Sequence, residues 1–166
     1  MQLSYDEAKL IAGFILADYE RERVTTLRVL GSIPDGKGDY APDPKSMSAL
    51  KLAFHTVASE WYFLETIHLG APPTKFPEFP DSMVSAQDVV AWEKSKLPAQ
   101  IDKAKSLSGE LLSRTIAFGE KMKLPAYSVL MLMLKHSIHH RGQLSVYLRP
   151  MGATVPSIYG PSGDTK

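Results

Sequence analysis

The sequence predicts an all-α protein, and within that class a four-helix bundle. Apolar residues recur at helical spacings of three and four in four separate segments, whereas the alternating pattern of a strand is nearly absent. A chain of 166 residues with 44% hydrophobic side chains is long enough to bury one core without cross-links. We therefore expect a single domain over residues 1–166, in which residues 152–166 form an irregular C-terminal tail.

The first helix is predicted to begin after Ser4. Ser4 and Glu7 have the spacing of a capping box, in which each side chain accepts a hydrogen bond from the other residue's backbone N–H. Gly31 and Pro34 end the helical pattern, and the glycines and prolines of residues 32–44 predict a loop. The residues expected on the buried face of this helix are Leu10, Phe14, Ala17, Val24 and Leu27.

A second helix is predicted between an N-cap at Ser46 and Gly70. Its expected core stripe consists of Met47, Leu50, Phe54, Val57, Trp61 and Leu64. Four prolines then keep the chain extended as far as about Met83. Extended chain advances about 3.3 Å per residue against about 1.5 Å in a helix, so this connection can run the length of the bundle. We therefore expect the second and third helices to be parallel and joined by a crossover.

Ser85 is a cap-like start for the third helix. Its expected stripe consists of Val90, Leu97, Ile101, Ala104, Ser108, Leu111 and Thr115. Pro98 falls inside this stripe, and proline removes one helical hydrogen bond, so a kink or a short break is expected near residues 95–97.

Gly119 and residues 121–123 predict a loop, and Pro125 suits the first turn of a fourth helix. Pro150 and Gly152 end this helix. One of its faces carries Val129, Met133, His136, His140, Gln143 with Leu144, and Tyr147.

Composition excludes several functional classes. Nineteen basic and eighteen acidic residues give a formal charge of +1, and no segment carries a basic stripe, which argues against a nucleic-acid partner. The sequence has no cysteine, so disulfides, cysteine nucleophiles and iron–sulfur clusters are excluded. The acidic residues near the start do not fit a signal peptide, and no apolar run would span a bilayer, so we expect a cytoplasmic protein without a membrane partner.

Three histidines have the pattern of metal ligands. Residues four apart on a helix point the same way, so His136 and His140 can hold one ion. His55, near the middle of the second helix and beside Phe54, can supply a third imidazole. The competing interpretation is a pair of surface or hydrogen-bonded core histidines, but burying imidazoles on an apolar stripe is costly unless their nitrogens find partners.

The remaining histidines have simpler explanations. His139 lies about 100° around the helix from His140 and is expected at the rim of the site, while His68 closes the second helix, where the helix dipole favours a cation. Ser137 stands where a zinc protease of the H-E-x-x-H type has its catalytic glutamate, so that class is not matched. The sequence has no C-x-x-C-H motif for haem attachment, and three converging imidazoles suit a small ion better than haem.

The segment 136–144, together with Tyr147-Leu148-Arg149 and the tail from Gly152 to Asp164, resembles the DinB/YfiT-like superfamily of four-helix-bundle metalloproteins. Ser46-Met47 and His55 with Glu60 also fit the second helix of that family. The resemblance covers most of the chain, but only the H-x-x-x-H-R-G-Q segment with its tail is specific. It implies a three-histidine metal site at His55, His136 and His140, a crossover between helices two and three, and frequent homodimers.

The resemblance does not imply one reaction, since relatives include thiol-dependent transferases and isomerases as well as proteins of no known activity. Three neutral imidazoles leave an open coordination position, which is typical of a catalytic ion. Because the chain has no cysteine, we expect a thiol-transferase type of enzyme that uses a low-molecular-weight thiol and a small electrophile. The alternatives are a metal-dependent hydrolase and a non-catalytic metal-binding or stress-linked interaction protein.

The expected cofactor is one divalent transition metal, with zinc or nickel favoured and iron also compatible with imidazole ligands. The sequence assigns no catalytic residue. Gln143 and Tyr62 each lie seven positions from a proposed ligand and could orient a ligand or substrate, or be ordinary helix residues. Arg141 could bind an anion or pair with Asp164. Trp61, Trp92, Met131 and Met133 are interpreted as core packing.

Overall fold

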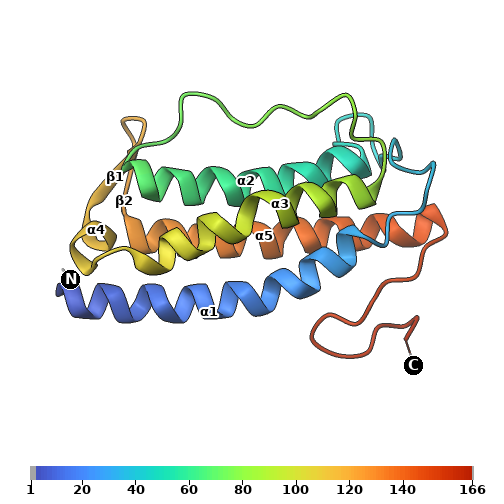
Figure 1. Ribbon diagram of the computed structural model, residues 1–166. Coiled ribbons are helices and arrows are strands. Elements are labelled where there is room, and N and C mark those ends of the chain that lie inside the picture. The colour runs from blue at the N-terminus through green and yellow to red at the C-terminus, as the bar shows by residue number, and fades with distance from the viewer. Residues whose placement is uncertain (1–2, 166) are drawn as a thin grey trace.

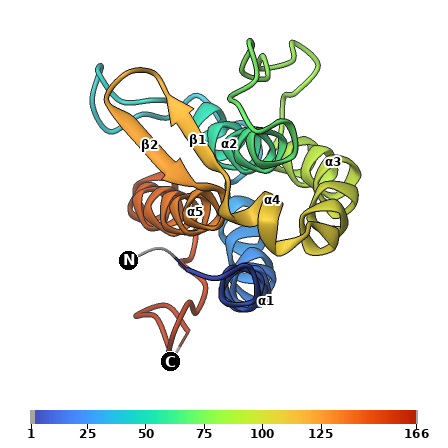
Figure 2. The same ribbon diagram turned by 90° about the vertical axis from the view of Figure 1, so that its left-hand side faces the viewer.

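Four long helices form the body of the protein in the computed structural model, which describes residues 3–165 (Figure 1). They are α1 (Tyr5–Leu30), α2 (Ala49–Leu69), α3 (Ala86–Ser106) and α5 (Ala126–Leu148). Seen end-on, they occupy the four corners of a bundle (Figure 2). The predicted all-α four-helix bundle is therefore confirmed; residues 1–2 and 166 of the predicted domain lie outside the described residues.

The predicted crossover is also present. Helices α2 and α3 run in the same direction, and the segment between them returns along the length of the bundle, whereas α1 and α5 run the opposite way (Figure 1). Helix α5 packs against both α1 and α2. None of the helices in the described part of the chain combines the length and apolar character needed to cross a bilayer.

The boundaries of α1 match the prediction, but its predicted buried face is wrong. Ser4 and Glu7 form both hydrogen bonds of the capping box, and Gly31 caps the C-terminal end. However, Leu10, Phe14 and Val24 are 62%, 70% and 64% exposed. The face that meets the core instead carries Ala8, Ala12, Ile15, Leu16, Tyr19, Thr26, Val29 and Leu30. Helix α1 therefore has two apolar faces, and periodicity alone does not say which one packs inward.

Helix α2 begins at Ala49 after Ser48, not after Ser46, and the Ser48 side chain makes no capping hydrogen bond. Met47 consequently lies outside the helix and is 46% exposed. The rest of the predicted stripe is buried, except for Trp61, which is partly buried. Gly70 ends the helix with a φ of +80°, a left-handed conformation that glycine adopts without the steric penalty of a side chain.

Helix α3 continues through Pro98, so of the predicted kink or short break the break is absent. Pro98 lies on the exposed face, where water can satisfy the backbone carbonyl that loses its helical donor. The helix ends earlier than predicted, at Ser106, and Ser108 caps a separate short helix, α4 (Gly109–Ser113). Gly109 has no room for a side chain, because a Cβ atom there would lie 2.0 Å from the carbonyl oxygen of Tyr5.

A small hairpin stands where part of the third helix and a loop were predicted. Strand β1 (Thr115–Phe118) pairs antiparallel with β2 (Met122–Pro125), and Gly119 turns between them with a φ of +69°. Strands of four residues are too short to show a clear alternation in sequence. Pro125 is the N-cap of α5 rather than part of its first turn, and α5 continues into a 3₁₀ helix, η1 (Arg149–Met151).

The core consists of two apolar clusters with a polar layer between them. One cluster includes Val29, Phe54, Val89 and Leu144, and the other includes Leu16, Leu64, Leu97 and Met133. Along each helix, buried polar residues fall between these two sets; they include Thr26 on α1, Glu60 on α2, Glu93 on α3 and Ser137 with Arg141 on α5. The middle of the bundle is therefore held by hydrogen bonds and ion pairs as well as by apolar packing.

Candidate metal centre

Helices α2 and α5 bring the three predicted histidines together. One ring nitrogen each from His55, His136 and His140 lies within 4.8 Å of the others. The ring centroids of His55 are 5.2 Å from His136 and 4.8 Å from His140. All three side chains are only partly buried, so the cluster is open on one side. The three histidines, which the sequence placed on two separate helices, therefore form one cluster.

The spacing of the nitrogens fits a single ion. A tetrahedral ion with metal–nitrogen bonds of about 2.0–2.1 Å places its ligand atoms about 3.4 Å apart. The Nε2 atoms of His136 and His140 are 3.1 Å apart, close to that value. The His55 nitrogen lies within 4.8 Å of both. Three imidazoles would occupy three positions of a tetrahedron and leave the fourth open.

The protonation states of the three rings also suit a cation. Burial, together with the neighbouring His140 and His55, lowers the pKa of His136 to about 4. Burial likewise lowers the pKa of His55 and of His140. Neutral imidazole is the form that binds a metal, so the cluster is preset for binding near neutral pH.

Gln143 fixes the orientation of one ring. Its Oε1 atom lies 3.0 Å from Nδ1 of His140, which places the proton of the neutral ring on Nδ1 and leaves the Nε2 lone pair facing the cluster. The Gln143 amide in turn lies 3.5 Å from the hydroxyl of Tyr147. By contrast, Nδ1 of His136 is buried with no hydrogen-bond partner among the described residues.

Aromatic side chains that the sequence analysis did not assign to the site surround the histidines. Phe76, from the crossover, stacks on His55 with a centroid distance of 5.7 Å, and Phe63 meets His136 edge-on at 5.6 Å. Phe118 of the hairpin lies 6.4 Å from Phe63. In the sequence, Phe76 stands out only as a large apolar residue in the connection between α2 and α3, whose prolines exclude a helix.

The remaining predicted residues lie outside the cluster. His139 is exposed at its rim, with its ring 4.9 Å from that of His140. Tyr62 is 5.5 Å from Phe76 and forms part of the aromatic surround. His68 lies at the end of α2, 3.6 Å from Glu65, and burial lowers its pKa, which opposes the cationic form that the helix-dipole argument assumed.

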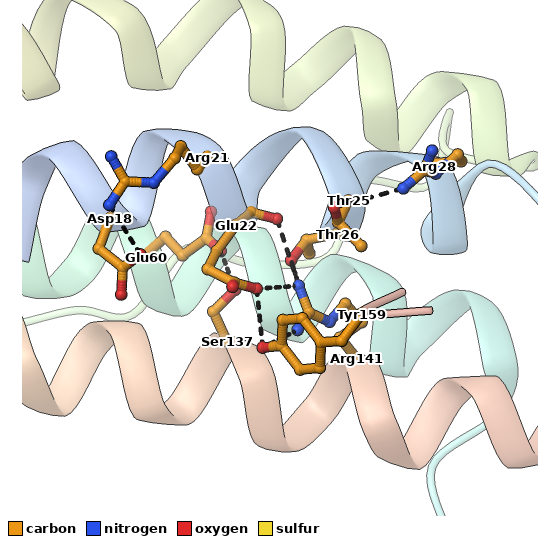
Figure 3. A network of polar contacts seen from close by, with 10 residues as sticks. All are labelled: Asp18, Arg21, Glu22, Thr25, Thr26, Arg28, Glu60, Ser137, Arg141 and Tyr159. Atoms are coloured by element: carbon orange, nitrogen blue, oxygen red, sulfur yellow. Dashed lines mark hydrogen bonds and ion pairs between the residues drawn. The ribbon is translucent and has the colours of Figure 1, made fainter. Parts of the chain in front are cut away.

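Arg141 makes different contacts from the two that the sequence suggested. It is buried and forms an ion pair of 2.5 Å with Glu22 of α1, while the Tyr159 hydroxyl bonds to both residues at 2.6 and 3.0 Å (Figure 3). Asp164 pairs with Arg149 instead. Arg141 therefore anchors α5 and the C-terminal tail to α1, one residue after the proposed ligand His140.

A second polar group crosses the core next to the histidines. Glu60 accepts a hydrogen bond of 2.5 Å from the hydroxyl of Ser137 (Figure 3). It accepts a second, of 2.9 Å, from the hydroxyl of Tyr19. Burial raises the pKa of Glu60 to about 7, although both hydrogen bonds oppose the shift. Glu93, also buried, pairs with Arg23. The signal for Glu60 in the sequence was a carboxylate within an otherwise apolar stretch of helix.

Known proteins resemble this chain over most of its length. A profile of the DinB family matches residues 8–165. The uncharacterised Bacillus subtilis protein YrdA is 31% identical over 149 residues, which cover 89% of this chain and 87% of YrdA. YjoA, also uncharacterised and from the same species, is 31% identical over 150 residues, which cover 87% and 94% of the two chains.

Two crystal structures have the same fold. That of the DinB-like YjoA from Bacillus subtilis superposes with a TM-score of 0.72 and 27% identity, over 89% of this chain and 99% of YjoA. A DinB-like protein from Bacillus cereus also gives a TM-score of 0.72, with 25% identity over 87% of this chain and 95% of that one.

Proposed function

This chain belongs to the DinB family, and on that premise we propose that it binds one divalent transition metal through His55, His136 and His140. The observation that carries the proposal is the convergence of three neutral imidazoles from two helices within 4.8 Å. Among the residues that the structure describes, no carboxylate takes part in this cluster. Imidazole ligands favour zinc or nickel, with iron also acceptable.

Elemental analysis of protein purified without a histidine tag tests the metal site. We expect about one equivalent of zinc or nickel per chain, and loss of most of it in a His136→Ala variant. His139→Ala is the matched control, because His139 is a neighbouring histidine that lies exposed at the rim. Full metal retention by His136→Ala, with its helical circular dichroism intact, would rule out the proposed ligand set.

We propose further that the centre serves an enzyme of the thiol-transferase type. A divalent ion bound there would supply Lewis acidity, which lowers the pKa of a thiol at the open position. The chain's own residues would hold the ion, orient His140 through Gln143, and shield one side of the centre with Phe63 and Phe76. Because the chain has no cysteine, the thiol must be a separate low-molecular-weight cosubstrate.

Incubation with bacillithiol, mycothiol or glutathione and monochlorobimane tests this activity. The thiolate sulfur forms a bond to the bimane carbon and chloride leaves, so the fluorescent thioether measures the transfer. We expect the zinc- or nickel-loaded protein to accelerate the reaction with one of these thiols, and His136→Ala to lose the acceleration while His139→Ala keeps it. Rates equal to the metal-free background with every thiol would contradict a thiol transferase.

The two alternatives give different outcomes. A hydrolase would turn over ester or amide substrates with no thiol added. A non-catalytic metal protein would show neither activity, and its ion would mainly join α2 to α5. In that case the ion should raise the melting temperature strongly and exchange slowly, since a ligand that binds only the folded state stabilises it by mass action.

We also propose that the protein forms a homodimer through α1. The exposed face of this helix carries Leu10, Phe14 and Val24, an apolar surface that is unusual for a monomer. Two copies packed antiparallel about Ala17 would set Leu10 against Val24 and Asp6 against Arg28 across the two-fold axis. Apolar and opposite-charge pairs then face each other, so this face is complementary to itself.

A further inference from the structure

A hollow beneath the crossover has the lining of a small anion-binding pocket. It has a volume of about 290 Å³ and is lined by residues of α2, α3 and the crossover. Figure 2 shows the crossover on the outer side of α2 and α3. Its walls are Trp61 of α2, Trp92 of α3, and Phe76 with Pro77 of the crossover. Lys75 and Lys96 complete the lining, and no acidic residue takes part in it.

The two lysines give the hollow its charge. Lys75 comes from the crossover and Lys96 from α3, so two separate elements direct basic residues to one place. Among residues 3–165, neither lysine has a carboxylate within ion-pair distance, although other basic residues such as Lys105 and Arg149 do. An unpaired pair of ammonium groups beside apolar walls attracts an anion more strongly than the same groups in open water.

The aromatic walls of the hollow favour a ligand with a flat ring. Trp61, Trp92 and Phe76 offer flat surfaces on which an aromatic ring can stack. Trp92 is held by an edge-on contact with Phe54 at 5.3 Å, and Phe76 by its contacts with His55 and Tyr62, so the walls are positioned before a ligand arrives. The volume lies near the lower limit for small-molecule pockets, which limits the ligand to one or two rings.

We infer that this pocket binds a small aromatic anion, with its ring between the two tryptophans and Phe76 and its carboxylate or comparable group at Lys75 and Lys96. Phe76 is a shared wall, since one of its sides stacks on His55. The pocket therefore lies next to the proposed metal centre without using any of the three histidines. The inference does not rest on the proposed function and goes beyond it.

The protein carries its own probe of this pocket, because Trp61 and Trp92 are the only two tryptophans in the chain. We would titrate the full chain with 3-phenylpropionate and record tryptophan emission excited at 295 nm, where the ligand does not absorb. The uncharged 3-phenylpropionamide is the matched ligand. We expect a saturable change with the carboxylate, and an affinity about tenfold weaker for the amide because its attraction to the lysines is lost.

Lysine-to-glutamine variants test whether 3-phenylpropionate binds in this hollow. Lys96→Gln and Lys75→Gln should each weaken binding of 3-phenylpropionate several-fold and leave that of the amide unchanged. Lys94→Gln is the control, because Lys94 is an exposed lysine on the same helix that does not line the pocket. His136→Ala should bind 3-phenylpropionate as the unmodified protein does, which separates this test from the metal proposal.

Three results would overturn the inference. They are the absence of any saturable change in emission, equal affinity for the carboxylate and the amide, and equal loss of binding in Lys94→Gln and Lys96→Gln.

Discussion

At the scale of single residues, the contact that most directly orients a ring of the candidate metal centre is the hydrogen bond between Gln143 and His140. It is made within one turn of α5, so the helix itself sets both the position and the tautomer of this ligand. His136, four residues earlier, has no corresponding acceptor for its Nδ1 atom among the described residues. The two histidines of the motif are therefore not equivalent, and His140 is the better oriented of the two.

Replacing Gln143 with leucine should weaken metal binding by roughly 10- to 100-fold, because the His140 ring loses the acceptor that orients it. Competition with a chromophoric chelator measures the dissociation constant directly. Gln143→Glu is the control: it keeps an oxygen acceptor at the same place and should retain the affinity. Equal affinities of the leucine and glutamate variants would show that Gln143 does not position His140.

Glu60 should make stability depend on pH. Its pKa of about 7 in the fold lies above the 4.5 of an unfolded chain, so the folded state holds an extra proton between these values. The contribution of the protonated Glu60 side chain to the free energy of unfolding is therefore complete below about pH 4.5 and is lost as the pH rises through 7. The loss is on the order of 3 kcal/mol.

A Glu60→Gln variant isolates this effect, since its amide oxygen can accept from one of the hydroxyls of Tyr19 and Ser137, its NH2 group can donate to the other, and the amide cannot titrate. Urea unfolding of both metal-free proteins at several pH values should show the wild type falling behind the variant as the pH rises from 4.5 to about 8. A difference in unfolding free energy that does not change with pH would mean that Glu60 stays ionised in the folded protein.

At the scale of elements, the junction between α3 and α4 depends on close packing at Gly109. A side chain there would collide with the backbone of Tyr5 at the start of α1, and backbone cannot move aside as a flexible side chain can. Gly109→Ala should therefore cost about 1–3 kcal/mol of unfolding free energy.

Gly142→Ala is the opposing control for the same chemical change. Nothing lies within 4 Å of a Cβ atom at Gly142, which is exposed within α5. Alanine is the better helix former, so this variant should gain about 0.5–1 kcal/mol. Thermal or urea unfolding measures both variants, and a stable Gly109→Ala protein would show that α4 can move away from α1.

The sequence predicted the elements better than their contacts. Capping boxes, glycine stops and the proline-rich crossover are local signals, so the start of α1, the end of α2 and the parallel pair α2 and α3 could be read directly. The buried face of α1 could not, because Phe14 and Leu16 are both apolar and only the neighbouring helices decide which one packs inward. The hairpin at residues 115–125 was missed because its strands are too short to form a pattern.

The candidate metal centre could also be predicted where it depends on local helix geometry, and not where it depends on the path of distant segments. His136 and His140 share a helix, so their common direction follows from helix geometry alone. Whether His55 lies near these two residues depends on how α2 packs against α5. Its position near the middle of the second helix predicted this proximity, which the structure shows. Phe76 and the contacts of Arg141 depend on the path of the crossover and of the tail, which no periodicity describes.

At the scale of the whole molecule, the exposed face of α1 predicts self-association. Phe14→Glu should convert the homodimer to a monomer, because it places like charges near the centre of the two-fold contact. Light scattering coupled to size-exclusion chromatography measures the mass of each species. Tyr159→Glu is the control, since Tyr159 is 73% exposed on the tail and outside the α1 face; a monomeric unmodified protein would contradict the proposal.

The packing of α5 against both α1 and α2 has a consequence for biosynthesis. Helix α5 follows the other three long helices in the chain, and synthesis proceeds from the N-terminus. While α5 is still being translated, α1 and α2 can pack against α3 but lack the contacts that α5 makes with both of them in the folded protein. His55 therefore meets His136 and His140 only after the fourth long helix has been made, so the proposed metal site is complete only late in synthesis and an ion held by all three histidines cannot template the early steps of folding.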